Sequence, residues 1–271
     1  MAYCRLHEVT HHAAPMCSMA RIGMDTMADA STPTRGITRA AAAGLTPPFL
    51  IVNPKAYLWG AELLRLARLT DELAGQFGIA TIFTAQHVDL RAVVEGTDHL
   101  LVSAQHLDGI EPGRGMGHIL PEGLAAAGAR AVVLNHAEHQ LSLAQLDAAM
   151  RRAHEVGLLS IVCADTDAQC RAVATLGPDV MICEPTANIG TGVMDAGDYV
   201  ERTTRIVKAV DPSILIIQAA GVSRGSDVAR VIRQGADGSG GTSGIIKAPD
   251  WREILTEMYQ ALRDAKNETA R

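Results

Sequence analysis

The feature that most constrains the fold is a regular alternation of short apolar runs with amphipathic stretches, which begins at Phe49 and continues almost to the end of the chain. Apolar runs of four to six residues that alternate with helical patterns predict βαβ units and a parallel sheet. The runs are continuously apolar, as in a sheet that is covered on both faces. The predicted strands are FLIVN (49–53), ATIFTA (80–85), LLVSAQ (100–105), AVVLN (131–135), LLSIVC (158–163), VMIC (180–183), ILIIQA (214–219) and a weak run after Asp237.

The amphipathic stretches that separate these runs complete the pattern. They predict helices over 61–76, from Leu90, over 121–127, 142–155, 167–176, 196–210, 227–234 and 251–265. Eight strand–helix units favour an α/β fold of the (β/α)8 barrel type over an open doubly wound sheet, which stays as the alternative.

The segment 1–47 differs from the rest of the chain. It shows no such periodicity, and it ends at the pair Pro47–Pro48. We expect residues 1–47 to form a flexible N-terminal extension and residues 48–271 to form one barrel domain that carries the catalytic site.

Composition excludes several classes of function. Lys and Arg number 24 and Asp and Glu 30, for a net charge of −6, and aromatic residues make up only 3%. Nucleic-acid binding needs a basic face and is not expected. No apolar stretch reaches the length of a membrane span. Five cysteines without a CxxC pair suggest reduced thiols in a cytoplasmic protein.

In a barrel of this kind, the polar residues that follow each strand form the active-site face. A lysine there can stabilise a developing oxyanion, a histidine can donate to a carbonyl, and a carboxylate can act as a base. Taken singly, each has a plainer interpretation as a solvated lysine, a structural histidine or a surface acid. The polar residues at the predicted strand ends are Asn53, Lys55, Gln105, His106, Asn135, His136, Glu138, Cys163, Glu184, Gly221, Thr242 and Ser243.

Taken together, these residues and their neighbours resemble the triosephosphate isomerase family, in particular its short archaeal branch. The resemblance runs from about Val52 to Ala248, and its motifs keep their order and spacing at the strand ends. The matching motifs are NPKAY (53–57), AQHLDGIEPG (104–113), GHILPE (117–122), LNHAE (134–138), EVGLLSIVC (155–163), CEP and NIGTG within 183–192, AAGVS (219–223) and SGIIKA (243–248).

The resemblance implies a TIM barrel that interconverts glyceraldehyde 3-phosphate and dihydroxyacetone phosphate, a reaction of glycolysis and gluconeogenesis, through an enediol. It implies that Lys55 is the electrophilic lysine, His136 the proton-shuttling histidine and Glu184 the base, a pattern known for this family. The segment from Thr186 to Gly192 would be a mobile lid. Neither proton transfer needs a metal or an organic cofactor.

The resemblance also implies the substrate-binding residues. The phosphate of a small phosphorylated sugar would lie on backbone amides, which suit an anion. The implied positions are Asn53, Gly190, Gly221, Thr242 and Ser243.

Several positions depart from the family pattern. Ala137 follows the histidine where a serine is usual, and Arg114–Gly117 replaces a His-Thr-Gly turn. Thr186–Asn188 and Ala219–Gly221 also differ. The largest departure is the glycine-rich run Asp237–Gly241 at the eighth strand, because glycines weaken a strand and leave space where side chains should fill the barrel.

These departures leave three alternatives open. An isomerase with the same three residues could act on another small sugar phosphate, such as a tetrulose phosphate. A non-catalytic barrel could bind a phosphosugar, although such a protein has no need of a base. An aldolase with Lys55 as a Schiff base is less favoured, because Lys55 is not within an apolar strand.

Assembly is the last expectation. The family resemblance implies a homo-oligomer, a dimer or a tetramer, that is held by the loop after the third strand. Here this loop is Asp108–Gly117, and Met116 near its tip could fill an apolar pocket of a partner.

Overall fold

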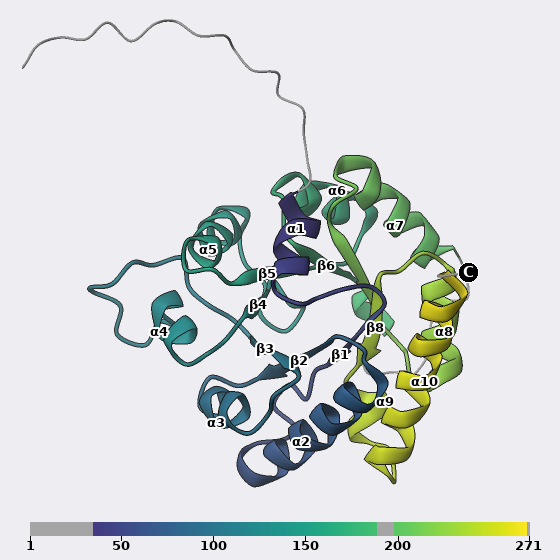
Figure 1. Ribbon diagram of the computed structural model, residues 1–271. Coiled ribbons are helices and arrows are strands. Elements are labelled where there is room, and N and C mark those ends of the chain that lie inside the picture. Colours follow the sequence, from purple (N-terminus) through teal and green to yellow (C-terminus); the bar gives the residue numbers. More distant parts are fainter. Residues whose placement is uncertain (1–34, 189–197, 270–271) are drawn as a thin grey trace, which may run out of the picture. The chain divides into compact units, whose positions relative to one another are not determined.

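A computed structural model describes residues 35–188 and 198–269. Eight parallel strands pair in sequence order, and β8 pairs with β1 to close the barrel (Figure 1). The predicted (β/α)8 barrel is therefore confirmed, and the open sheet is excluded. The strands are β1 (Phe49–Val52), β2 (Thr81–Ala85), β3 (Leu100–Ala104), β4 (Ala131–Leu134), β5 (Leu159–Ala164), β6 (Val180–Cys183), β7 (Leu215–Gln218) and β8 (Gly238–Gly241).

Helices surround the barrel and follow the predicted order (Figure 1). Eight of them were expected from the amphipathic pattern. Two short helices, α1 and α9, and one 3-10 turn were not. The helices are α1 (Arg35–Ala42), α2 (Gly60–Phe77), α3 (Leu90–Glu95), α4 (Pro121–Ala126), α5 (Leu143–Glu155), α6 (Asp167–Thr175), α7 (Tyr199–Val210), α8 (Gly225–Arg233), α9 (Ser243–Ile246) and α10 (Trp251–Thr269), with the 3-10 turn η1 at Thr186–Asn188.

Alternate residues of each strand face two different cores, as the pleat requires. One core lies between the strands and the helices, and it contains Leu50 and Val52 of β1. The other fills the barrel interior, and it contains Phe49 and Ile51 of the same strand. The continuously apolar strands of the sequence are explained by burial on both faces.

The glycine-rich run does form strand β8, so the expectation that it leaves unfilled space was wrong. A Cβ atom at Gly238 would lie 2.5 Å from the ring of Phe49, and one at Gly240 would lie 1.9 Å from the carbonyl oxygen of Ile51. The ring of Phe49 and the backbone of β1 therefore occupy the space that side chains of β8 would fill. Glycine is needed here because the two backbones approach closely.

The N-terminal boundary of the barrel also differs from the expectation. Residues 35–42 form helix α1, and Ala40 and Leu45 are buried in the barrel-interior core. Arg39 donates to the carbonyl oxygen of Leu158 at 3.2 Å, and Arg130 donates to that of Ala43 at 2.7 Å. The folded part thus begins upstream of residue 48. Residues 1–34 lie outside the described part of the chain.

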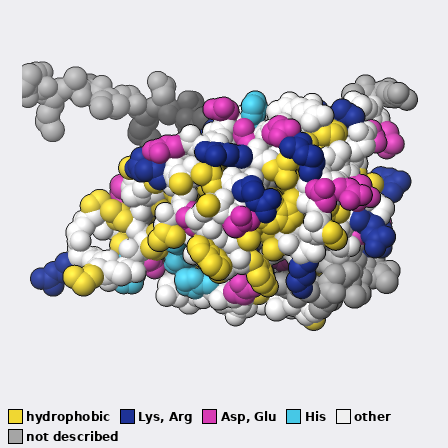
Figure 2. Space-filling model, turned by 90° about the horizontal axis from the view of Figure 1, so that it is seen from below, with side chains coloured by type: hydrophobic (Ala, Val, Ile, Leu, Met, Phe, Trp, Pro, Cys, Tyr) yellow, Lys and Arg dark blue, Asp and Glu magenta, His cyan; other side chains and the backbone are white. Residues whose placement is uncertain are grey.

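The surface agrees with the composition. On the face drawn in Figure 2, Lys and Arg side chains are mixed with Asp and Glu, and the described residues form no broad basic area there. Among the helices that the structure describes, none has the length and apolar character that would let it cross a membrane.

Candidate active site

A cavity of about 150 Å³ opens at the carboxyl ends of the strands. It is lined by residues that follow β1, β4, β6, β7 and β8, so segments far apart in the sequence meet in it. The lining residues include Asn53, Lys55, Tyr57, His136, Glu138, Glu184, Gly221, Thr242 and Ser243.

Lys55 lies in the turn after β1, with a φ of 49° that is unusual for a residue with a side chain. The side-chain oxygen of Asn53 holds this turn, because it accepts the Lys55 N–H at 3.0 Å and the Thr84 hydroxyl at 2.6 Å. The Lys55 Nζ atom reaches Glu138 Oε1 at 2.7 Å. The strained backbone therefore delivers an ammonium group into the cavity, where a carboxylate orients it.

His136 follows β4, and its ring is held by its own turn. The backbone N–H of Glu138 donates to Nδ1 of His136 at 3.1 Å. An Nδ1 atom that accepts a hydrogen bond assigns the proton of a neutral imidazole to Nε2. Burial and the nearby charge of Lys55 lower the pKa of His136, and Glu138 only partly opposes them. The ring is therefore neutral at pH 7 and has an N–H to donate.

Glu184 follows β6, and its backbone N–H donates to the carbonyl oxygen of Ala164 at 3.0 Å. Burial raises the pKa of its carboxyl group from 4.5 to about 7; Lys55 opposes the rise, and the charges of Glu138 and Asp165 add to it. The described residues give this carboxylate no hydrogen-bond donor. A carboxyl group with a pKa near 7 is suited to take up and release a proton at neutral pH.

The turns after β7 and β8 form another part of the cavity wall. Gly221, Thr242 and Ser243 line it without a basic side chain. Gly221 has a φ of 76°, and a Cβ atom at Gly244 would lie 2.6 Å from the Cα of Ser223, so the turns after β7 and β8 pack closely. Amide groups in such turns can hold an anion without a cation.

The structure thus brings seven of the eight expected site residues to one cavity. Gly190, the eighth, lies outside the described residues, as do Thr191 and Gly192 of the expected lid. Glu138 was noted at a strand end but given no role, and its charge, opposite to that of Lys55, was the signal that could have found it. Tyr57 was missed, since nothing in the sequence marks its place.

Other polar groups near the strand ends have structural contacts. Cys163 is 4% exposed, and burial raises the pKa of its thiol well above the usual value, so it is a core thiol. His106 packs against the ring of His139 at 4.1 Å and pairs with Asp108, and its backbone oxygen contacts His87 Nε2 at 2.8 Å. These contacts agree with a packing role for His87 and His106.

Sequence comparisons with known proteins identify the family of the chain. The sequence profile described as "Triosephosphate isomerase" matches residues 48–258. A triosephosphate isomerase of Methanopyrus kandleri is 39% identical over 224 residues, which are 80% of this chain and 99% of that protein. The triosephosphate isomerases of Methanocaldococcus jannaschii and Caldivirga maquilingensis are 34% and 35% identical, over 78% and 79% of this chain and 98% and 97% of those proteins. Helix α1 precedes the residues that the family profile matches. The chain belongs to the triosephosphate isomerase family.

Proposed function

We propose that the protein interconverts glyceraldehyde 3-phosphate and dihydroxyacetone phosphate, with Glu184 as the base, His136 as the proton donor and acceptor at the substrate oxygens, and Lys55 as the electrophile. The observation that carries this assignment is the meeting of a carboxyl group of pKa about 7 with a neutral imidazole and an ammonium group in one cavity.

The chemistry follows from these three groups. Removal of a proton from the carbon beside a carbonyl requires a base near the carbon and donors near the oxygen. Glu184 takes the proton from one carbon and returns it to the next. The Nε2–H of His136 and the ammonium of Lys55 stabilise the negative charge that develops on the oxygens. Glu138 would keep Lys55 in place through the 2.7 Å ion pair.

The phosphate group would lie against the turns after β7 and β8. Gly221, Thr242 and Ser243 offer backbone amides and hydroxyl groups there, in the same cavity as Glu184. Asn53 would act indirectly, because its side-chain oxygen is occupied by Lys55 and Thr84. Gly190 is proposed as a further phosphate contact on the basis of the family motif alone.

A coupled assay tests the proposal. The purified protein is given glyceraldehyde 3-phosphate, and erythrulose phosphates are offered in parallel. We expect kcat/KM to be highest for the triose phosphate, and Lys55→Met to lose most of it because the electrophile is gone. Turnover of an erythrulose phosphate in preference to the triose would make the protein an isomerase of another sugar phosphate. Binding without turnover of either would make it a phosphosugar-binding barrel.

We also propose a homo-oligomer that is held by the loop between β3 and α4, which extends beyond α4 and α5 in Figure 1. The loop is closed by Asp108, whose N–H donates to the Ile119 carbonyl and whose carboxylate accepts the Ile119 N–H. Met116 in this loop is 103% exposed. The thioether of this side chain can adapt to an irregular apolar pocket on a partner.

A second copy of the chain offers apolar surface that such a loop could cover. Tyr57, Trp59 and Val88 are exposed by 57%, 70% and 84% in the turns after β1 and β2. We expect light scattering to show at least a dimer, and Met116→Asp to reduce the mass, since a buried unpaired charge is costly. A monomeric parent, or an unchanged mass for the variant, would contradict this proposal.

A cytoplasmic location is proposed as well. Cys163, Cys170 and Cys183 are free and buried. Free thiols are typical of proteins that work in a reducing compartment.

A further inference from the structure

The end of strand β5 is held by three different elements through three consecutive carbonyl groups. The carbonyl oxygen of Cys163 accepts the side-chain amide of Asn135 at 3.0 Å. That of Ala164 accepts the backbone N–H of Glu184 at 3.0 Å, and that of Asp165 accepts the Tyr199 hydroxyl at 2.5 Å. The bond to the Ala164 carbonyl holds the backbone of Glu184, the proposed base. The bonds to the Cys163 and Asp165 carbonyls hold the residues on either side of Ala164, so they affect where the Glu184 backbone lies.

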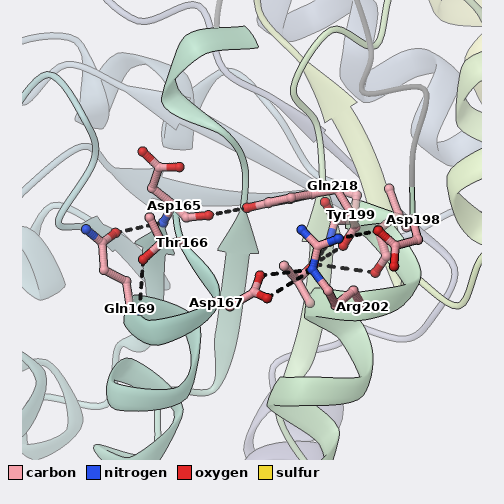
Figure 3. Close-up of polar contacts among 10 residues, drawn as sticks. Asp165, Thr166, Asp167, Gln169, Asp198, Tyr199, Arg202 and Gln218 are labelled. Carbon is pink, nitrogen blue, oxygen red and sulfur yellow. Dashed lines mark hydrogen bonds and ion pairs between the residues drawn. The ribbon is translucent and has the colours of Figure 1, made fainter.

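Tyr199 reaches this point from the first turn of α7. In Figure 3, its side chain extends from α7 to the Asp165 carbonyl. The residue is only 7% exposed, and its own carbonyl oxygen accepts the hydroxyl of Thr203 at 2.7 Å, which in turn accepts the amide of Gln218 at 2.9 Å. The backbone of Tyr199 is therefore tied to β7 by a chain of two hydrogen bonds, and burial restricts the ring that carries its hydroxyl to the Asp165 carbonyl.

The Asp165 turn has one further anchor on its own helix. The backbone N–H of Asp165 donates to Oε1 of Gln169 at 2.9 Å (Figure 3). Arg202 of α7 pairs with Asp167 at 2.9 Å, which connects α7 to the start of α6. These contacts keep α6 and α7 together. The Asn135 amide bonds to the backbone on one side of the Glu184 anchor, and the Tyr199 hydroxyl, which comes from α7, bonds to it on the other side.

We propose that Tyr199 is a positioning residue for Glu184, because its hydroxyl fixes the turn at the end of β5 on which the backbone of the base is held. The inference rests on the proposed role of Glu184 as the base. It assigns to α7 a part in catalysis that no motif of the sequence indicates.

The surroundings of Glu184 make its acid–base behaviour a sensitive measure of this position. The charged or titratable groups of the described residues that surround it are Lys55 from the turn after β1, His136 and Glu138 from the turn after β4, Cys163 and Asp165 from the end of β5, Cys183 from β6, and Tyr199 from α7. If the β5 turn loosens, water gains access to Glu184, and its pKa falls toward the usual value.

The test compares Tyr199→Phe with Tyr259→Phe. Both variants keep the ring and delete one buried hydroxyl. The Tyr259 hydroxyl bonds to Thr81 and Thr70 in the core around α10, away from the cavity, so the second variant controls for loss of stability. For Tyr199→Phe we expect kcat to fall about five- to tenfold, as for the loss of one ordinary hydrogen bond, with KM little changed. We also expect the acid limb of the kcat/KM profile to move to lower pH in Tyr199→Phe alone.

A double variant separates this inference from the proposed base. In the Glu184→Gln background, Tyr199→Phe should cause no further loss, since the residue acts through the base. If Glu184→Gln is nearly inactive but Tyr199→Phe has the parental kcat and pH profile, or the two tyrosine variants lose kcat equally, Tyr199 has no positioning role. If Glu184→Gln itself keeps the parental turnover, the base has been assigned wrongly.

Discussion

Strand β6 carries one carboxylate immediately before it and one immediately after it, and the two have opposite surroundings. Asp179, at the amino-terminal end of the barrel, is 2% exposed and fully engaged. It accepts the N–H of Ser160 at 2.8 Å and contacts the Ser160 hydroxyl and His154 Nε2, both at 3.1 Å, and it pairs with Arg39 at 3.0 Å. Glu184, at the other end, receives no donor from the described residues.

The difference shows how one strand can serve both stability and reactivity. A buried carboxylate with several donors is stabilised in its charged form and holds neighbouring elements together. A carboxylate that is buried without donors is destabilised in its charged form, so it binds a proton near neutral pH. Burial is the main cause of the pKa of about 7 of Glu184, and the charges of Glu138 and Asp165 add to the rise, which Lys55 only partly opposes.

The largest effect is expected at the Glu184 end. Glu184→Gln keeps the size of the side chain and removes the base, and we expect kcat to fall on the order of 10³-fold with KM little changed, as for loss of a general base. Glu184→Asp should also lose activity, because a misplacement of about 1 Å can cost about 10²-fold. Steady-state kinetics with glyceraldehyde 3-phosphate measures both. Parental turnover in Glu184→Gln would mean that the two ends of β6 do not differ in function.

Truncation of the N-terminus should destabilise the barrel at the amino-terminal end of β6, where Asp179 lies. Deletion of residues 1–45 removes Arg39 and Leu45. Asp179 then loses its ion pair with Arg39, and the barrel-interior core loses the side chain of Leu45. We expect a loss of about 4 kcal/mol, from the buried side chains of Ala40 and Leu45 and a broken, partly buried ion pair. The melting temperature would fall on the order of 10 °C. Deletion of residues 1–34 is the control, and it should change stability little, because the described side-chain contacts begin at Arg39. Equal melting temperatures for the two truncations would show that α1 does not support the barrel.

Asp179→Asn tests the same end without removing α1. The amide keeps the shape but replaces an acceptor with a donor that faces Ser160 or Arg39, and we expect a cost of about 3 kcal/mol in the free energy of unfolding. Chemical denaturation measures it. Because Asp179 lies at the end of β6 that is remote from the cavity, kcat of Asp179→Asn should be unchanged. Glu184→Gln should show the reverse, a lower kcat without loss of stability. A large fall of kcat in Asp179→Asn would remove the distinction between the two ends.

The smallest effect is a pH dependence of stability. The folded state raises the pKa of Glu184, so between pH 4.5 and about 7 it binds more protons than the unfolded state, and this contribution to stability decreases as pH rises. Glu184→Gln should therefore match the parent below pH 4.5 and exceed it by about 1 to 3 kcal/mol above pH 7. Denaturation curves at pH 4 and pH 8 would show this; a constant difference between the two proteins would contradict it.

The sequence was sufficient for the barrel because its apolar runs have the length and period of buried parallel strands. It was also sufficient to place Lys55, His136 and Glu184 in one cavity, since each lies at or just after the end of such a run. It did not indicate α1, because this helix has only eight residues and one large apolar side chain, too short a segment to stand out as an amphipathic pattern. It could not indicate Tyr199 either, because a tyrosine at the start of an amphipathic helix is ordinarily read as a core residue, and its hydroxyl partner is a backbone carbonyl 34 positions away.

The prediction that strand β8 leaves unfilled space was wrong because its glycines meet residues that are far away in the sequence. The Phe49 ring and the backbone of β1 fill the space beside them. This has a consequence for the motions of the barrel. The seam between β1 and β8 joins residues from opposite ends of the domain, and β8 contributes backbone hydrogen bonds but hardly any apolar side-chain area. Segments that bury little apolar area open at low free energy, so amide hydrogens along β8 should exchange faster than those of the other strands. Thr242 and Ser243, the proposed phosphate ligands, directly follow β8. A bound phosphate would therefore stabilise the pairing of β8 with β1 and slow hydrogen exchange along β8.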